Sequence, residues 1–227
     1  MNTTKRFPLL ALLLLVPVPS IGVLVGMIIA PDFFGRAIFF ISKMWILAIP
    51  LFWHLFVDKQ KLSLSKPTNG GFIVAALLGI AASVVILIFY FTFGRCLIEP
   101  QRIKEMAANL GLNNLRTYLL GAGYWILINS ALEEYVWRWF VVQKCKSILP
   151  VNAAILLSAL CFTIHHIIAL QIYFDWLIVS AASIGIFAGG VAWSWCYNKY
   201  HSIWPGYISH AIVDVVVFAI GYILIFK

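Results

Sequence analysis

Charged residues are scarce in this chain: they make up 11% of its 227 residues, against about 25% in an average soluble domain. Hydrophobic residues make up 63% of the sequence. A water-soluble fold has too little interior to cover that much apolar surface, so the composition excludes a soluble globular protein. We therefore expect lipid to be the solvent of most of the chain.

Cysteine motifs are also missing. The four cysteines, Cys96, Cys145, Cys161 and Cys196, are scattered without CxxC spacing. This pattern predicts neither a disulfide framework nor a zinc knuckle. No cofactor is implied.

Acidic residues are outnumbered by basic ones, which gives a formal net charge of +8. In a soluble protein this excess could indicate nucleic-acid binding. Here Lys and Arg fall mainly in the short segments between apolar runs, which is the ordinary topology signal of membrane proteins. No basic helix or aromatic-basic platform stands outside those runs, so we expect no nucleic-acid partner.

Long apolar runs are abundant, and a helix of about 20 apolar residues crosses the hydrocarbon core of a bilayer. The runs predict an all-α, polytopic bundle of about seven spans, at residues 8–30, 37–57, 71–93, 117–143, 151–170, 174–197 and 203–226. The first follows Lys5 and Arg6 as a signal peptide would, but its apolar character continues too far, so we interpret it as an uncleaved span. The connection 95–116 predicts an interfacial helix.

Ionisable side chains inside the spans are the main functional candidates, because each is costly at membrane depth unless it is paired or wetted. The fourth predicted span carries Glu133, Glu134 and Arg138. On an α-helix Glu134 and Arg138 share a face and can pair, whereas Glu133 points elsewhere. Glu134 is therefore the expected structural partner of Arg138, and Glu133 is the candidate general base.

Two later spans add polar groups at helical spacing. Phe162 and His166 lie four residues apart on one face, with His165 rotated away from them. His210 and Asp214 form a second pair at the same spacing. Such a set suits peptide hydrolysis, with Glu133 and His166 acting on water and with His210 and Asp214 at the oxyanion. An ionised Asp214 cannot donate a hydrogen bond, so it must be protonated or must hold His210 as an imidazolium.

Taken in order, Glu-Glu-x-x-x-Arg at 133–138, Phe-x-x-x-His at 162–166 and His-x-x-x-Asp at 210–214 carry a family resemblance. The chain resembles the CaaX-protease and bacteriocin-processing family, also called the Abi family, of glutamic intramembrane endopeptidases. The resemblance implies that Glu133 and His166 activate water and that His210 and Asp214 line the oxyanion site. The third motif often ends in Asn in the family, whereas this chain has Asp214, and the His165-His166 doublet leaves two candidate histidines.

The resemblance also sets expectations for organisation and substrate. It covers roughly residues 117–226, so we expect N-terminal spans and an interfacial helix at 1–116 and a catalytic helical core at 117–227 in one membrane domain. The expected partners are the lipid bilayer and a membrane-associated or C-terminally sorted peptide or protein. Compact size is typical of the bacterial members, and this indicates a multi-pass protein of a bacterial cell membrane.

Other interpretations of the same residues stay open. A zinc-dependent membrane protease could use the Glu, His and Asp side chains, although the HExxH helix of common zinc proteases is absent. A non-enzymatic immunity or peptide-binding protein, or a small transporter with a proton relay, could also use a polar cavity. Lys43 and His54 have no partners at motif spacing, and we interpret them as snorkelling or interface anchors.

Overall fold

The computed structural model describes residues 7–30, 32–61 and 65–227, and this part of the chain contains helices and no strand. Lys5 and Arg6, which precede the first predicted span, lie outside the described residues. The all-α prediction is confirmed.

The N-terminal helices form a hairpin. Its first arm consists of α1 (Pro8–Leu15), α2 (Pro17–Val23) and the π-helical segment η1 (Leu24–Ile29). Its second arm consists of α3 (Phe33–Phe52) and η2 (Trp53–Val57). Asp32 begins the second arm as an N-cap, because its carboxylate accepts a 3.1 Å hydrogen bond from the Gly35 amide.

The next helical stretch is α4 (Phe72–Phe89), which continues through η3 (Tyr90–Gly94) and α5 (Arg95–Leu97). The predicted interfacial connection contains α6 (Pro100–Asn109), which begins with a proline at its first position. Ile103 and Ala107 form the buried side of α6, which packs against α12 (Ile203–Phe226).

The motif-bearing fourth segment is helical throughout, from α7 (Leu115–Tyr124) to α9 (Gln143–Cys145). Between them lie η4 (Trp125–Asn129), α8 (Ser130–Glu133) and η5 (Glu134–Val142). The prediction assumed regular α-helical geometry here, but η5 is π-helical directly after Glu133. π-helical turns within α-helices are frequent at functional sites.

Two further long helices complete the fold: α10 (Val151–Leu170) and α11 (Trp176–Tyr200), with α12 following after a short turn. Within the described residues six helical stretches are long and apolar enough to cross a membrane: 8–29, 33–57, 72–97, 151–170, 176–200 and 203–226. They coincide with six of the seven predicted spans. The remaining one, 117–143, is helical but is not among the six.

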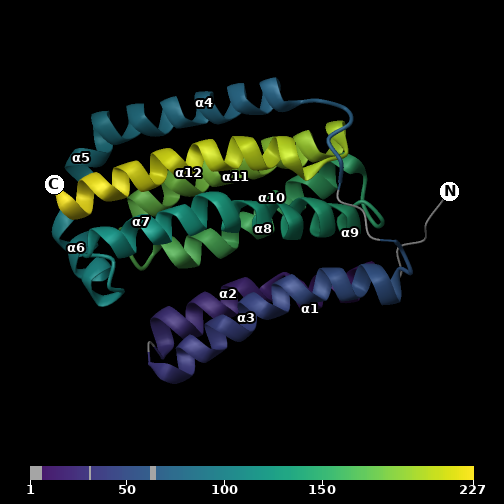
Figure 1. Ribbon diagram of the computed structural model, residues 1–227, viewed down its shortest axis with the longest axis horizontal. Coiled ribbons are helices and arrows are strands. Elements are labelled where there is room, and N and C mark those ends of the chain that lie inside the picture. The colour runs from purple at the N-terminus through teal and green to yellow at the C-terminus, as the bar shows by residue number, and fades with distance from the viewer. Residues whose placement is uncertain (1–6, 31, 62–64) are drawn as a thin grey trace.

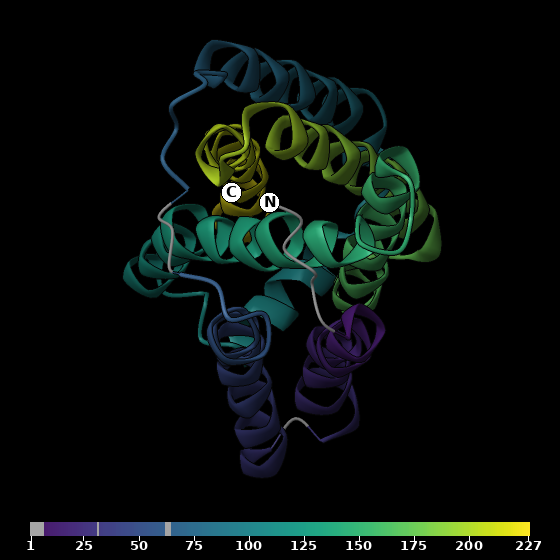
Figure 2. The same cartoon turned by 90° about the vertical axis from the view of Figure 1, so that its right-hand side faces the viewer.

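The helices run side by side in one bundle (Figure 1). Helix α4 packs along α12 on one side, and the N-terminal hairpin of α1 to α3 lies on the opposite side, as the end-on view shows (Figures 1 and 2). Between them α11 and η5 pack against α12, and α10 packs against α11 and η5. The three motifs therefore lie in the middle of the bundle.

Large apolar side chains cover the outer surface, such as Phe33, Ile73 and Ile184, which are 83%, 77% and 74% exposed. A continuous apolar exterior of this kind is stable only against lipid. The protein is therefore an integral, multi-pass membrane protein.

A buried ion pair joins the hairpin to the core. Lys144 Nζ lies 2.6 Å from Asp58 Oδ2, and the two side chains are 2% and 6% exposed. Burial lowers the pKa of Lys144, and the hydrogen bond to Asp58 opposes that shift. The Tyr135 hydroxyl also donates a 3.0 Å hydrogen bond to the Leu47 carbonyl oxygen. These contacts keep α3 against the motif-bearing helix.

Gly79 allows α4 to approach the site helix α12, and replacing it with alanine tests that contact. A Cβ atom on Gly79 would lie 2.8 Å from the Ser209 carbonyl oxygen, beside His210. We expect Gly79→Ala to destabilise the protein by about 1–3 kcal/mol through overpacking, measured as the unfolding midpoint in mixed micelles. Gly185→Ala is the matched control, since a Cβ there meets open space. Equal stability of the two variants would contradict the expectation.

Candidate active site

The two neighbouring glutamates both reach the interior of the bundle, but they differ in exposure. The Glu134 side chain is 0% exposed and the Glu133 side chain is 14% exposed. Glu134 Oε1 lies 3.4 Å from Arg138 Nε, so the predicted pair across one helical turn is present. Gly206 on α12 makes room for this carboxylate, because a Cβ there would lie 2.5 Å from Glu134 Oε2.

His210 lies between the two glutamates. Its Nδ1 is 3.2 Å from Glu134 Oε1 and its Nε2 is 3.6 Å from Glu133 Oε2. A carboxylate only accepts hydrogen bonds, so Nδ1 donates to Glu134. Trp193 stacks on the imidazole with the ring centres 4.0 Å apart and the planes at 14°. Stacking on Trp193 thus fixes the plane of the His210 ring, and the hydrogen bond to Glu134 fixes its rotation within that plane, with Nε2 facing Glu133.

Asp214 lies one helical turn after His210, and its Oδ2 is 3.9 Å from His210 Nε2. The Ser130 hydroxyl donates a 2.6 Å hydrogen bond to the same oxygen. Ser130 is fully buried and precedes Glu134 by four residues. Asp214 is therefore attached to the motif-bearing helix and stands beside His210 rather than apart from it.

His166 is oriented by its own helix. Its Nδ1 lies 2.9 Å from the Phe162 carbonyl oxygen, and because that oxygen only accepts, Nδ1 carries the proton. The other ring nitrogen, Nε2, is not committed to that carbonyl oxygen. The Phe162 and His166 rings lie 4.2 Å apart, which holds the imidazole against the aromatic face. His166 also interacts electrostatically with Glu133.

His165 lies nearer to His166 and Glu133 than its position on the helix predicted. It is 9% exposed, its ring centre is 5.0 Å from that of His166, and it too interacts electrostatically with Glu133. The described residues provide no hydrogen-bond partner for its Nδ1. Its ring therefore lacks the orientation by a carbonyl that His166 has.

Arg138 is enclosed by aromatic rings. Its guanidinium carbon lies 4.5 Å from the centre of Phe162 and 5.1 Å from that of Trp193. The described residues offer no hydrogen-bond partner to its three guanidinium nitrogens. Ring faces and the Glu134 carboxylate therefore compensate this buried cation. Phe162 links the cation to His166, which explains a role for the aromatic residue of the second motif.

Two polar residues near Glu133 did not emerge as site candidates from the sequence. Asn129 Nδ2 donates a 2.8 Å hydrogen bond to Glu133 Oε1, and Lys43 Nζ on α3 donates a 3.4 Å hydrogen bond to Asn129 Oδ1. Lys43 was interpreted as a snorkelling residue, but its ammonium group points to the site. The four-residue spacing of Asn129 and Glu133 was the available signal for one of them.

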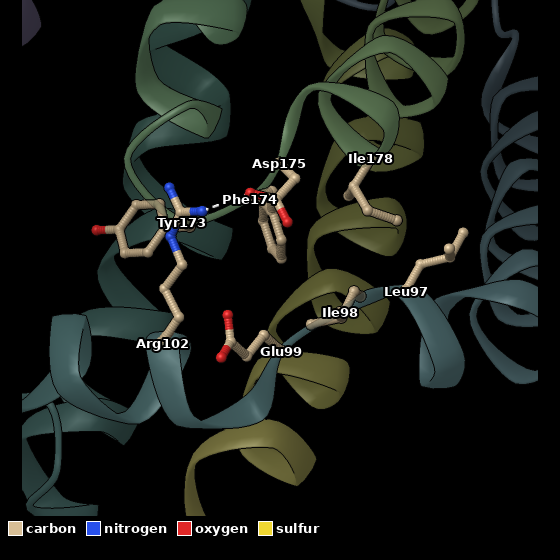
Figure 3. A pocket seen from close by; sticks show the side chains of 8 residues that line it. All are labelled: Leu97, Ile98, Glu99, Arg102, Tyr173, Phe174, Asp175 and Ile178. Atoms are coloured by element: carbon tan, nitrogen blue, oxygen red, sulfur yellow. Dashed lines mark hydrogen bonds and ion pairs between the residues drawn. The ribbon is translucent and has the colours of Figure 1, made fainter.

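A separate pocket lies away from the three motifs, at one end of the bundle. It is lined by Leu97, Ile98, Glu99, Arg102, Tyr173, Phe174, Asp175 and Ile178 (Figure 3). Arg102 bridges it, with Nη1 2.7 Å from Asp175 Oδ1. Burial raises the pKa of Tyr173, one of its walls. The pocket contains none of the predicted site residues.

Within the described residues no group of three or more His, Cys, Asp or Glu side chains is arranged to hold a metal ion. Glu133 does interact electrostatically with His166 and with His210, and Asp214 interacts with all three. The residues predicted from the sequence to share one site are therefore brought together by three helices.

Comparison with known proteins adds the family. Residues 115–216 match the Rce1-like family, described as type II CAAX prenyl endopeptidase Rce1-like. Residues 115–216 belong to the CAAX-protease family. This range holds all three motifs, from Glu133 to Asp214, and it identifies the protein as a peptidase. No curated protein and no solved structure matches the chain.

The match of residues 115–216 to a CAAX endopeptidase family agrees with the bilayer environment of the helices, and the two findings together indicate an intramembrane protease. The match begins at α7, so the hairpin of α1 to α3 and helix α4 lie outside it. The division of the chain into 1–116 and 117–227 stays a prediction, as do the catalytic roles of single residues.

Proposed function

We propose that the protein is a glutamic intramembrane endopeptidase in which Glu133, with His166, activates the water that attacks a peptide bond. The observation that carries the proposal is the surroundings of the Glu133 carboxylate. His166 and His165 from α10 and His210 from α12 all act on it electrostatically. Histidines from two other helices thus surround the partly exposed Glu133 carboxylate, and general acid–base catalysis requires such a grouping of proton donors and acceptors.

The first step is attack by water. Glu133 accepts a proton from the water while the water oxygen bonds to the carbonyl carbon of the scissile peptide. The Nε2 atom of His166 accepts the other water hydrogen as a hydrogen bond, because Nδ1 is committed to the Phe162 carbonyl oxygen. The carbonyl π electrons move to oxygen and give a tetrahedral oxyanion. Glu133 then passes its proton to the leaving nitrogen as the C–N bond breaks.

The oxyanion needs donors, and His210 is the one that this arrangement favours. His210 Nδ1 donates its hydrogen bond to Glu134, so Nε2 can also donate only if the ring is an imidazolium. Three carboxylates surround this ring, those of Glu133, Glu134 and Asp214. Their combined negative charge favours the imidazolium. Asp214 accepts from Ser130 and adds to this charge, so it serves through His210 rather than as a direct donor.

The proposed substrate class, a prenylated protein that ends in a CAAX sequence, follows from the family description of a CAAX prenyl endopeptidase. Such a substrate enters from the lipid, where the bundle exposes apolar side chains, and its peptide bond is cut near the membrane-associated C-terminus. In a bacterial member, the corresponding substrates would be membrane-associated or C-terminally sorted peptides or proteins.

The experiment is cleavage by the purified full-length chain in lipid nanodiscs. The probe is an internally quenched, farnesylated peptide that ends in a CAAX sequence, and mass spectrometry of the products identifies the cleaved bond. We expect cleavage that Glu133→Gln slows by about a thousandfold and that a metal chelator leaves unchanged. Binding of the peptide without cleavage would favour the peptide-binding alternative, and restoration of chelated enzyme by zinc would favour the zinc protease.

The histidine doublet gives a matched pair of variants. We expect His166→Gln to lower kcat about a hundredfold, as loss of a positioned proton acceptor does, because Phe162 orients only this ring. His165→Gln should cost less than about tenfold, since its ring is not oriented by a carbonyl oxygen. Both are measured with the farnesylated peptide. A larger loss in His165→Gln would move the water-activating role to the other histidine.

A further inference from the structure

Lys43 is an ionisable residue at a depth where snorkelling does not account for it. It lies ten residues after Phe33, the start of α3, and fourteen before Val57, the end of the span. At 1.5 Å per residue these are about 15 Å and about 21 Å of helix. Its ammonium group is directed sideways to Asn129 on the neighbouring helix instead of to either end of the bundle.

The hydrogen bonds from Lys43 to Glu133 run in one direction only. Lys43 Nζ donates to Asn129 Oδ1 at 3.4 Å, and Asn129 Nδ2 donates to Glu133 Oε1 at 2.8 Å. An ammonium group has only donors and a carboxylate only acceptors, so the amide between them fits one way round. Asn129 is 4% exposed and cannot exchange these partners for bulk water. Lys43 holds the amide oxygen and the carboxylate holds the amide NH2 group, so both ends of Asn129 are fixed.

The hydrogen bond to one oxygen of the Glu133 carboxylate determines the direction in which the other oxygen points. With Oε1 of Glu133 bound by Asn129, Oε2 faces His210 Nε2 at 3.6 Å. The groups that act on Glu133 from the surrounding helices are His165 and His166 on α10, His210 on α12 and Lys43 on α3. Asp214 on α12 interacts with it as well. Lys43 is the member of this set that comes from outside the three motifs.

We propose that Lys43 is a positioning residue for Glu133: through Asn129 it fixes the carboxylate so that one oxygen is bound and the other faces the reacting water. This inference rests on the proposed function. It assigns a part in the reaction to α3, a helix that precedes the residues matched to the family. The N-terminal hairpin thus completes the site besides packing against it.

The test uses the full-length chain in nanodiscs and two measurements. Infrared difference spectra follow the carboxyl band of protonated Glu133, which is identified by its loss in Glu133→Gln, as the pH is lowered. Cleavage of the farnesylated peptide gives kcat and KM. The variants are Lys43→Met, Lys43→Arg, Asn129→Leu and the double variant. Ile41→Met is the matched control, because Ile41 is an exposed residue on the same helix.

We expect Lys43→Met to move the midpoint of the Glu133 band to higher pH, since the carboxylate loses an ordered donor and a nearby cation. We also expect kcat to fall by about tenfold, as the loss of a hydrogen bond to a charged group does, with KM unchanged. Lys43→Arg should restore both values. In the Asn129→Leu background Lys43→Met should cost nothing further, because its effect passes through Asn129.

An unshifted band in Lys43→Met, or a loss of kcat that adds to that of Asn129→Leu, would overturn the positioning role. So would an equal loss in Ile41→Met, which would mean that any change on α3 disturbs the site. The proposed function fails separately, by Glu133→Gln retaining activity or by the wild-type protein leaving the peptide uncut. In either case the infrared titration still decides whether Lys43 acts on Glu133.

Discussion

Glu133→Gln is expected to lower kcat for the farnesylated peptide by about a thousandfold, within the range for loss of a general base, while the protein stays folded. Glutamine has nearly the same shape, and its amide oxygen can still accept the hydrogen bond that Asn129 donates to Glu133 Oε1. What it cannot do is accept a proton from water. The loss should therefore appear in kcat, with peptide binding preserved.

Glu105→Gln is the control for this variant. Glu105 is an exposed residue of α6 that accepts a hydrogen bond from Gln101, far from the three motifs in sequence. The same chemical change there should leave both kcat and the unfolding midpoint within error of the wild-type values. A Glu133→Gln protein that still cleaves the peptide would remove the carboxylate from the mechanism, whatever the family.

The sequence selected residues that the structure brings close together, because its main signal is energetic. Glutamate, histidine and aspartate are costly in apolar helices, so Glu133, His166, His210 and Asp214 were candidates before any contact was known. The spacing of Glu134 and Arg138 also predicted their ion pair, which the structure confirms at 3.4 Å. Periodicity within one helix is enough for such predictions.

Contacts between helices were not predictable in the same way. The sequence assigned Glu134 to Arg138 alone, but Glu134 also accepts from His210, 76 residues later. Lys43 and Asn129 are 86 residues apart and meet only because α3 packs beside the motif-bearing helix. No pattern within one span reports which face of another span it meets. The π-helical geometry after Glu133 further changes where side chains point.

Glu134→Ala is expected to destabilise the protein by about 3–5 kcal/mol, the cost of leaving a buried charge without its partner. Arg138 is 1% exposed, and Glu134 is the carboxylate that lies against it. Removing that carboxylate leaves a guanidinium between the rings of Phe162 and Trp193. It also takes the acceptor from His210 Nδ1. The unfolding midpoint in mixed micelles measures the loss.

Companion variants separate charge from packing. Arg138→Met should cost less than Glu134→Ala, because Glu134 keeps the hydrogen bond from His210. The double variant Glu134→Leu with Arg138→Met should recover part of the stability, since no unpaired buried charge remains. Glu105→Ala on the exposed side of α6 should change stability by less than about 0.5 kcal/mol. If Glu134→Ala were as mild as Glu105→Ala, the ion pair would not hold the site together. His210 would then need another partner to keep its Nε2 atom facing Glu133.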